Sequence, residues 1–415
     1  MLGRYFRVVS FFVLCFLQLS ISHAQYQGFI YGKVTLKNKQ TYTGPIKWSG
    51  DQRLWSDVIV AKKTTHNALR YLSGPQRKQL LNAEEEKEID WKFMSLWKDK
   101  NPRRKAEVLC RFGDISTIHV MGDNKAQIYF KNGEKLRVES EERDSRHLGR
   151  SIVVYYKGDS HTIHWDEIGS VDFMEMPKDI RAARGEPIYG TVYTSKGAIT
   201  GFIQWDKYKY LDTHQLTGKK DGVGAVKRYS FQQIQRIERK DNSAKIFLKN
   251  GAEHRLSGAR DVSAAIRGIV VMQPNLGRVV IDWKAFESVK FTKQPDEGLA
   301  YVNYIKPKRL KAQVLTKDNR KVNGICIFDL DEEWDMELLE GRRDGLHYQI
   351  PFREIKKLLL QQGRYTQVIL NNGKTRLLGW ENDVSDKNWG VIIRSPNGDY
   401  EYFTWDKIKE IEFLK

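Results

Sequence analysis

Short runs of alternating apolar and polar residues, separated by Gly, Asn and Asp, make up most of the chain. Val, Ile, Tyr and Phe recur at every second position within these runs. A period of two is the signature of a β-strand that buries one face. The pattern therefore predicts an all-β protein.

A repeated ending interrupts the strand pattern at six places. In three of them a Trp precedes a Phe by eight positions, at Trp165 and Phe173, Trp283 and Phe291, and Trp405 and Phe413. The other three have the shorter form Phe-x-x-Ile and begin at Phe112, Phe231 and Phe352. Apolar residues three positions apart fit one helical turn. Each ending therefore predicts a helical turn that leads into a strand.

The two endings alternate and belong to two kinds of unit, which we call type a (Phe-x-x-Ile) and type b (Trp to Phe). Type a units open with a glycine four residues before an aromatic residue, at Gly44 and Trp48, Gly201 and Trp205, and Gly324 and Phe328. A glycine there suits a bulge or a sharp bend. Type b units contain an Asn-Gly hairpin signal. The chain is predicted to hold three tandem copies, each an a unit followed by a b unit.

The predicted fold class is all-β, with six tandem SH3-like barrel units of about 50 residues in three a-b pairs. The expected divisions are a signal peptide (1–24), unit 1a (25–120) with a helical insertion (60–107), unit 1b (121–175), a linker (176–187), units 2a (188–240) and 2b (241–293), a linker (294–309), and units 3a (310–361) and 3b (362–415).

The openings of the type a units resemble the first motif of the Sm-like and wider SH3-like small barrels. VYTSKGAITGFIQWDKYKYL (192–211) and VLTKDNRKVNGICIFDLDEEWDMEL (314–338) share its order of strand, turn, strand and Gly-x-x-x-aromatic-Asp. The resemblance implies a small-barrel fold. It does not extend to RNA binding, because Tyr210 and Glu333 stand where that family has a base-binding Asn.

Residues 1–24 have the form of a secretory signal. Arg4 and Arg7 precede an apolar run from Val8 to Leu19, and cleavage is expected after Ala24. The apolar run is too short to span a bilayer, and no later stretch qualifies, so we expect an exported protein of the periplasm or cell surface. Loss of the two arginines lowers the formal charge from +18 to +16. A basic balance favours anionic partners, although a basic surface without a dedicated partner remains the alternative.

The sequence holds no recognisable catalytic or metal-binding motif. Cys110 and Cys326 lie in different copies, and we expect neither a disulfide nor a metal site from them. His161 and His164 lie on opposite faces of a predicted strand, which does not suit one metal ion. We therefore predict no catalytic residue, no metal and no cofactor.

The insertion is the largest departure from the repeat. Trp48 and Phe112 are 64 residues apart, whereas the matching pairs in the other copies are 26 and 24 apart. Good helix formers after a Ser-Gly-Pro start predict one or two helices. An aromatic and basic partner surface is one interpretation, and docking against its own barrel is the other. The candidate residues are Trp91, Phe93, Trp97, Lys98, Arg103 and Arg104.

These features favour a noncatalytic binding or scaffold protein of the cell envelope, with an envelope protein or an anionic polymer as its partner. The first alternative is a binder of acidic glycan or, less favoured, nucleic acid through basic and aromatic side chains. The second is a hydrolase with dispersed residues, such as His147, His161 and His164.

Overall fold

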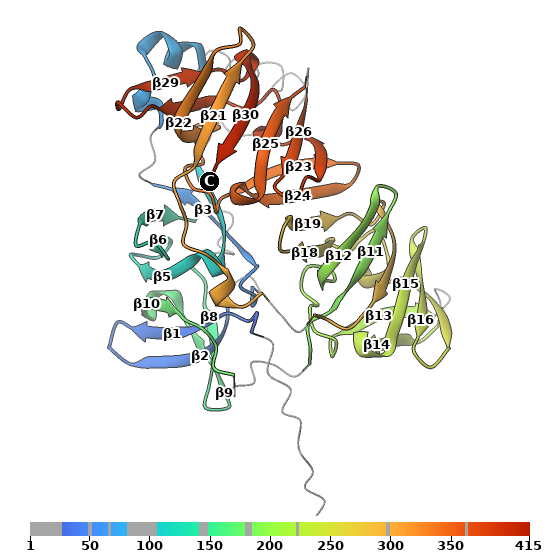
Figure 1. Ribbon diagram of the computed structural model, residues 1–415. Helices are drawn as coiled ribbons and strands as arrows, with labels where there is room; N and C mark the ends of the chain where they lie inside the picture. Colours follow the sequence, from blue (N-terminus) through green and yellow to red (C-terminus); the bar gives the residue numbers. More distant parts are fainter. Residues whose placement is uncertain are drawn as a thin grey trace, which may run out of the picture.

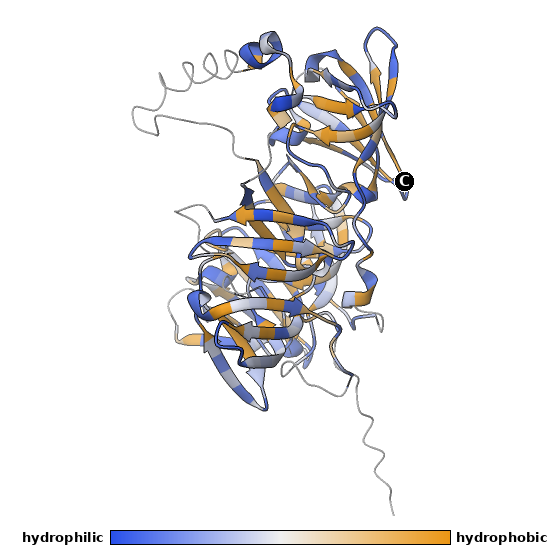
Figure 2. Cartoon of the chain, turned by 90° about the vertical axis from the view of Figure 1, so that its left-hand side faces the viewer, coloured by the Kyte–Doolittle hydropathy of each residue, from blue (hydrophilic) through white to orange (hydrophobic). Residues whose placement is uncertain are grey.

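The protein is described by a computed structural model that covers residues 27–48, 52–64, 68–80, 106–140, 148–178, 185–220, 224–295, 299–361 and 364–415. These residues form antiparallel strands joined by short turns (Figure 1). The prediction of an all-β protein is confirmed. Apolar and polar residues alternate along the strands, as the hydropathy colouring in Figure 2 shows.

The strands fall into three sets of ten. The first copy contains β1 (Tyr31–Leu36), β2 (Thr41–Lys47), β3 (Val58–Lys63), β4 (Glu107–Arg111), β5 (Ile115–Val120), β6 (Lys125–Phe130), β7 (Lys135–Glu139), β8 (Ile152–Tyr156), β9 (Asp159–Ile163) and β10 (Ile168–Phe173). The second contains β11 (Tyr189–Thr194), β12 (Gly197–Gln204), β13 (Gln215–Lys220), β14 (Val226–Ser230), β15 (Ile234–Lys240), β16 (Ser243–Leu248), β17 (Glu253–Ser257), β18 (Ile269–Gln273), β19 (Gly277–Ile281) and β20 (Phe286–Phe291). The third contains β21 (Lys311–Thr316), β22 (Lys321–Phe328), β23 (Leu338–Arg343), β24 (Leu346–Pro351), β25 (Ile355–Leu360), β26 (Tyr365–Leu370), β27 (Thr375–Gly379), β28 (Val391–Arg394), β29 (Tyr400–Phe403) and β30 (Ile408–Leu414).

Short helical turns begin at the Phe or Trp of five of the six predicted endings, which confirms the prediction there; at the sixth, Trp283, the chain makes a turn that is not helical. The five helical turns are η2 (Phe112–Asp114), η3 (Trp165–Glu167), η4 (Phe231–Gln233), η7 (Phe352–Glu354) and η9 (Trp405–Lys407). The remaining short turns are η1 (Ala68–Tyr71), η5 (Arg260–Val262), η6 (Tyr301–Asn303) and η8 (Asn382–Val384). Residues 74–80 form an α-helix in the insertion.

The same strand order recurs in every copy. In the first copy the order is β4-β3-β7-β6-β5-β10-β1-β2-β8-β9. The pairings of the second and third copies repeat it, with strand numbers ten and twenty higher. A group of five consecutive strands, β3 to β7 in the first copy, is thus inserted between β2 and β8. The repeat is therefore one ten-strand arrangement, used three times.

The prediction of six separate small barrels in tandem is not confirmed. Strands β1 and β2 come from the predicted type a unit, yet they pair with β10 and β8 of the type b unit. The described strands form large open antiparallel sheets and no closed barrel. The physical reason is that alternation of apolar residues identifies a strand and its buried face but does not specify its partner.

The repeated aromatic residues form the centre of each copy. Trp48, Trp205 and Phe328 are completely buried. Each contacts the Phe that begins the next turn, with ring centroids 5.2 Å apart for Trp48 and Phe112, 6.1 Å for Trp205 and Phe231, and 5.1 Å for Phe328 and Phe352. Burial of such large rings dominates core stability. The constant spacings in the sequence therefore reflect a core that is repeated in all three copies.

The type a glycines are required by a close approach of two strands. Gly44 pairs regularly with Gly32, so the predicted bulge or bend at this position is wrong. A Cβ at Gly44 would lie 2.0 Å from the carbonyl oxygen of Tyr155. At Gly201 and Gly324 the corresponding distances to a facing carbonyl oxygen are 2.2 Å and 2.1 Å. Any side chain would push the second strand away from its partner.

A side-chain acceptor precedes the third strand of each copy and fixes the loop before it; Asp57 and Glu337 are buried and His214 is partly buried. Asp57 accepts backbone hydrogen bonds from Arg53 and Leu54 at 2.8 and 2.9 Å. His214 uses Nδ1 in the same way, toward the N–H groups of Tyr210 and Leu211. Glu337 fills this role in the third copy, where it accepts from Glu333 and Trp334. One structural function is thus performed by three different residue types.

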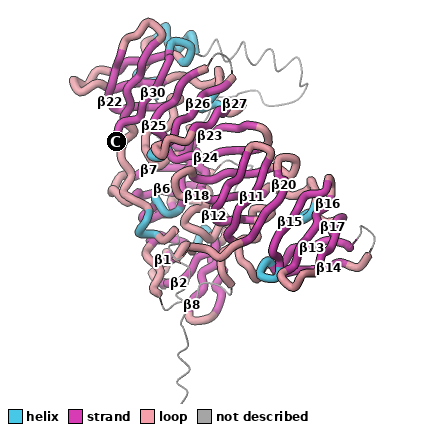
Figure 3. The backbone as a smooth tube through the Cα atoms, turned by 45° about the vertical axis from the view of Figure 1, so that its right-hand side comes forward, coloured by secondary structure: helices cyan, strands magenta, loops and turns pink. Residues whose placement is uncertain are grey.

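The second and third copies share a continuous sheet. Strand β19 pairs with β24, with Val279 opposite Tyr348 and Ile281 opposite Leu346. Figure 3 shows these two copies side by side. The first copy forms its own sheet, and its apolar core continues into side chains of both other copies, including Phe202 and Trp334.

The first and third copies are also joined by a buried ionic contact. The ammonium group of Lys63, on β3, lies 2.6 Å from Glu337 Oε1 and 3.1 Å from Asp331 Oδ1. The side chains of Lys63 and Glu337 are 2% and 1% exposed. Removal of one partner would leave a buried charge without compensation. This contact therefore fixes the insertion-bearing copy against the third copy.

Candidate functional site

The first described part of the insertion packs on the third copy. Ala68 and Leu72 join Ile327, Leu330 and Ile392 of the third copy in a small apolar cluster. The rings of Tyr71 and Tyr400 stack at 3.9 Å with an interplanar angle of 12°. Figure 1 shows the blue helical residues of the insertion beside β29. This part of the insertion thus lies against a different copy from the one that contains it in the sequence.

The helix that follows begins with a capping box. Ser73 donates its backbone N–H to Gln76 Oε1 at 2.8 Å, and the Gln76 N–H faces Ser73 Oγ at 3.4 Å. This reciprocal arrangement satisfies two otherwise unpaired backbone donors and fixes the helix start. The start of a helix here agrees with the Ser-Gly-Pro prediction, but residues 74–80 lie along the third copy, whereas docking against its own barrel is one of the expectations.

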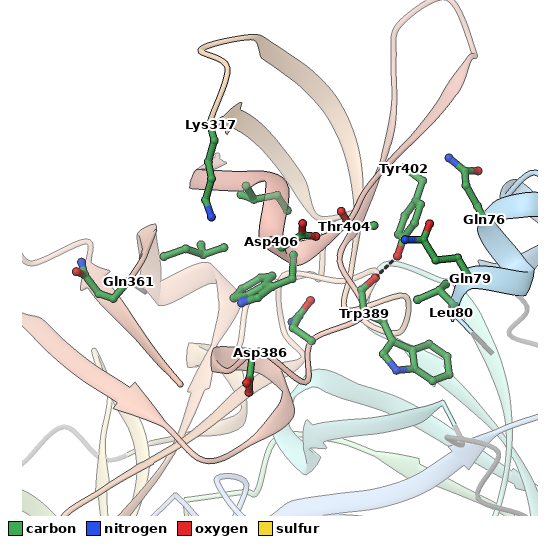
Figure 4. Close-up of a pocket in the computed structure, with 14 residues that line it drawn as sticks. Gln76, Gln79, Leu80, Lys317, Gln361, Asp386, Trp389, Tyr402, Thr404 and Asp406 are labelled. Carbon is green, nitrogen blue, oxygen red and sulfur yellow. Dashed lines mark hydrogen bonds between the residues drawn. The ribbon is translucent and has the colours of Figure 1, made fainter. Parts of the chain in front are cut away.

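A cavity of about 720 Å³ lies between this helix and the third copy (Figure 4). The helix contributes Gln76, Gln79 and Leu80. The third copy contributes the remaining lining residues: Lys317, Leu360, Gln361, Asp386, Asn388, Trp389, Tyr402, Thr404, Trp405, Asp406 and Ile408. A cavity of this size is in the range of small-ligand sites. The insertion of the first copy and the third copy therefore both contribute to the wall of this site.

Three aromatic residues line the cavity: Trp389, Tyr402 and Trp405. The Tyr402 hydroxyl donates to the Trp389 carbonyl oxygen at 2.6 Å, the dashed contact in Figure 4. Burial raises the pKa of the Tyr402 phenol well above its ordinary value, so this donor stays protonated. The hydrogen bond joins β29 to the loop before β28 and holds the aromatic wall in place.

Polar groups occupy the rest of the wall. Thr404 Oγ1 is buried and has no hydrogen-bond partner among the described residues. Figure 4 shows Thr404 next to Asp406, with Asp386, Gln361 and Lys317 around them. Two carboxylates and one ammonium group make the lining slightly acidic, in contrast to the formal charge of +18 for the whole chain. Such a lining suits a ligand that offers hydroxyl groups rather than a strong negative charge.

Trp405 differs from its counterparts in the other copies. Trp165 and Trp283 are 3% and 4% exposed. Their indole N–H groups donate to the carbonyl oxygens of Gly122 at 2.9 Å and Asp241 at 2.7 Å. Trp405 is only partly buried and forms part of the cavity wall. A position that belongs to the core in two copies is thus available to a ligand in the third.

The residues predicted from the sequence lie elsewhere or are not described. Trp91, Phe93, Trp97, Lys98, Arg103 and Arg104 fall outside the described residues, as does His147. His161 lies against Tyr42, 4.9 Å between ring centroids, and the backbone N–H of His164 donates to Glu167 Oε2 at 2.8 Å. The structure does not bring these histidines to the cavity.

The two cysteines are buried and free. Burial raises the pKa of both thiols, so neither is activated as a nucleophile. Among the described residues, no group of three or more His, Cys, Asp or Glu side chains is arranged to hold a metal ion.

The sequence analysis missed the cavity residues, although one signal was available. Asp386, Asn388 and Trp389 stand where the second copy has Ala264, Ile266 and Arg267. These polar and aromatic substitutions depart from the repeat within one short segment.

Compared with known proteins, the chain matches no family model, no curated protein and no solved structure. In the part of the chain that the structure describes, no helix is long and apolar enough to cross a membrane.

Proposed function

We propose that the protein is an exported, noncatalytic binding protein of the cell envelope, and that the cavity is its ligand site. The observation that carries the proposal is the cavity itself, formed where the insertion of one copy meets the third copy. The ten-strand arrangements serve as its scaffold. Export rests on the signal-like segment 1–24. We also propose, from the sequence resemblance of their openings, that the type a units are related to SH3-like small barrels.

The ligand class follows from the lining. Aromatic faces such as Trp405 suit the C–H face of a sugar ring, and neighbouring amides and carboxylates suit its hydroxyl groups. A buried hydroxyl without a partner destabilises the structure by about 1 to 3 kcal/mol, so a ligand hydroxyl that reaches Thr404 would gain affinity. We propose a short, uncharged segment of a glycan as the ligand.

Calorimetric titration with neutral glucose, mannose and N-acetylglucosamine hexasaccharides tests this proposal. Thr404→Val removes the buried hydroxyl and keeps the shape, and we expect it to weaken binding about tenfold. The control is Trp283→Phe. Trp283 is the second copy's counterpart of the cavity residue Trp405, so this variant should leave hexasaccharide affinity unchanged. Failure of all three hexasaccharides to bind would overturn the proposal, as would equal binding by the Thr404 variant.

Hydrolysis of the bound glycan is a second candidate, favoured by one observation. Asp386 and Asp406 both line the cavity, and pairs of carboxylates perform glycoside hydrolysis. Release of reducing ends from the bound hexasaccharide, lost in Asp406→Asn while binding is retained, would establish the enzyme. Absence of release from a tightly bound sugar would support the binding protein.

A further inference from the structure

Trp380 combines two features that are unusual for a tryptophan. Its φ is +70°, in the left-handed region that bulky residues rarely adopt. Its surface is 56% exposed to solvent. Burial therefore does not explain the strained backbone, and strain at an exposed residue is typical of functional sites.

The second copy shows what this position requires structurally. Gly258 aligns with Trp380 and has a φ of +66°. Glycine adopts this conformation without strain. The fold thus accepts the simplest residue here, and the third copy has the largest one instead. The core therefore does not require a tryptophan at this position.

Trp380 is part of a row of alternating cations and rings, which we call the Trp380 row. Arg343 lies 4.7 Å from the ring centre of Tyr365, the two rings are 6.5 Å apart, and Arg364 lies 5.7 Å from the Trp380 ring. Gly379 makes the row possible, because a Cβ there would lie 2.6 Å from the Tyr365 ring. In the second copy the aligned residues of Tyr365 and Arg364 are Ser243 and Asn242.

The charge around the row is moderately positive. Arg342 is paired with Glu381, and Asp344 contacts both Arg343 and Lys196. Arg364 lies over the Trp380 ring, and none of the ion pairs found between described residues near the row involves it. Four cations thus face two carboxylates, so the row has a net positive charge. This net charge attracts an anionic ligand, and the two carboxylates favour one whose negative charges are widely spaced.

We propose that the Trp380 row binds a carboxylated sugar unit of an acidic polysaccharide. The exposed face of Trp380 packs on the sugar ring, and the Arg364 guanidinium pairs with its carboxylate. A nucleic acid fits less well, because its closely spaced phosphates would meet Glu381 and Asp344. This site is separate from the cavity, although the two adjoin: Gln361, which lines the cavity, donates its N–H to the Tyr365 carbonyl at 3.2 Å.

The test uses the chain from residue 25 onward, which contains every described residue, and polygalacturonate as the probe. We expect Trp380→Gly and Arg364→Asn, the residues of the second copy, to weaken binding about tenfold each. Thermal melting should show that Trp380→Gly folds as stably as the parent chain. Tyr193→Ser is the matched control, because Tyr193 is also exposed, at 41%, but lies outside the row. It should bind as the parent does.

Three outcomes would overturn the proposal: unchanged polygalacturonate affinity in Trp380→Gly, equal binding of neutral dextran, or tighter binding of oligothymidylate than of polygalacturonate. Thr404→Val separates the two sites. A variant that loses hexasaccharide binding but keeps polygalacturonate binding affects the cavity alone. A variant with the reverse pattern affects the Trp380 row alone.

Discussion

The second and third copies have the same strand order and the same buried aromatic core, yet they differ at two aligned positions. At the first, Trp283 is buried, whereas the aligned Trp405 lines a cavity. At the second, Gly258 and Trp380 have nearly the same left-handed backbone but opposite side-chain size. Positions that all copies share maintain the fold. We propose that departures confined to one copy, where they are exposed or strained, mark the surfaces used for function.

The largest expected effect concerns the shared frame, where the two copies should respond alike. Trp205→Ala and Phe328→Ala each remove a fully buried ring and should lower the free energy of unfolding by about 3 to 5 kcal/mol. Urea unfolding followed by circular dichroism measures this. A loss below 1 kcal/mol in either copy would show that the frame is not the common core.

A smaller effect distinguishes the aligned tryptophans. Trp283→Phe removes a buried indole and its hydrogen bond to the Asp241 carbonyl, and we expect a stability loss of about 1 to 2 kcal/mol. Trp405→Phe should cost less stability but weaken hexasaccharide binding. Chemical unfolding and titration of both variants provide the comparison. Equal stability losses together with equal affinities would contradict a functional role for Trp405.

The side-chain acceptors before the third strands predict a pH dependence that differs between copies. Burial, with the nearby charges of Arg53 and Lys209, lowers the pKa of His214 to about 4. As pH falls from about 6.5 to about 4, the His214 imidazole becomes protonated in the unfolded chain but stays neutral in the folded protein. This contribution to the free energy of unfolding is therefore lost on acidification, by about 1 to 2 kcal/mol after allowance for solvent screening.

His214→Gln keeps an acceptor that does not titrate, so it should remove this loss when unfolding is measured between pH 7 and 4. Glu337, at the aligned position, behaves in the opposite way. Burial raises its pKa although the Lys63 ammonium group opposes the shift, so its contribution to the free energy of unfolding declines as pH rises through the raised pKa. A His214→Gln profile that coincides with that of the parent would refute the assignment.

The smallest effect concerns the left-handed corner. Trp380→Gly should change the free energy of unfolding by less than about 1 kcal/mol, because relief of strain offsets the lost ring contacts. The reverse change in the second copy, Gly258→Trp, introduces the same strain without its neighbours and should destabilise by about 1 to 2 kcal/mol. Thermal melts of the two variants sharpen the comparison. A severe loss in Trp380→Gly would mean that this tryptophan supports the fold.

The sequence predicted the strands, the three copies, the helical turns and the central aromatic residues, because these depend on local alternation and on spacing. It did not predict that β3 to β7 are inserted between β2 and β8, since strand pairing depends on contacts distant in sequence. The cavity was unpredictable for the same reason: Gln76 and Trp405 meet only after the first and third copies pack together. The sequence analysis did not single out Trp380, although the sequence alone shows a tryptophan aligned with Gly258.

The most direct test of the central claim is hydrogen–deuterium exchange of the chain from residue 25 onward, with and without soluble polysaccharide from the organism's own envelope. We predict slower exchange on binding in residues 361–380 and 386–406 of the third copy. The aligned segments of the second copy, 239–258 and 264–284, should be unchanged. Equal protection of both copies would contradict the account, because binding would then belong to the repeated frame rather than to its departures.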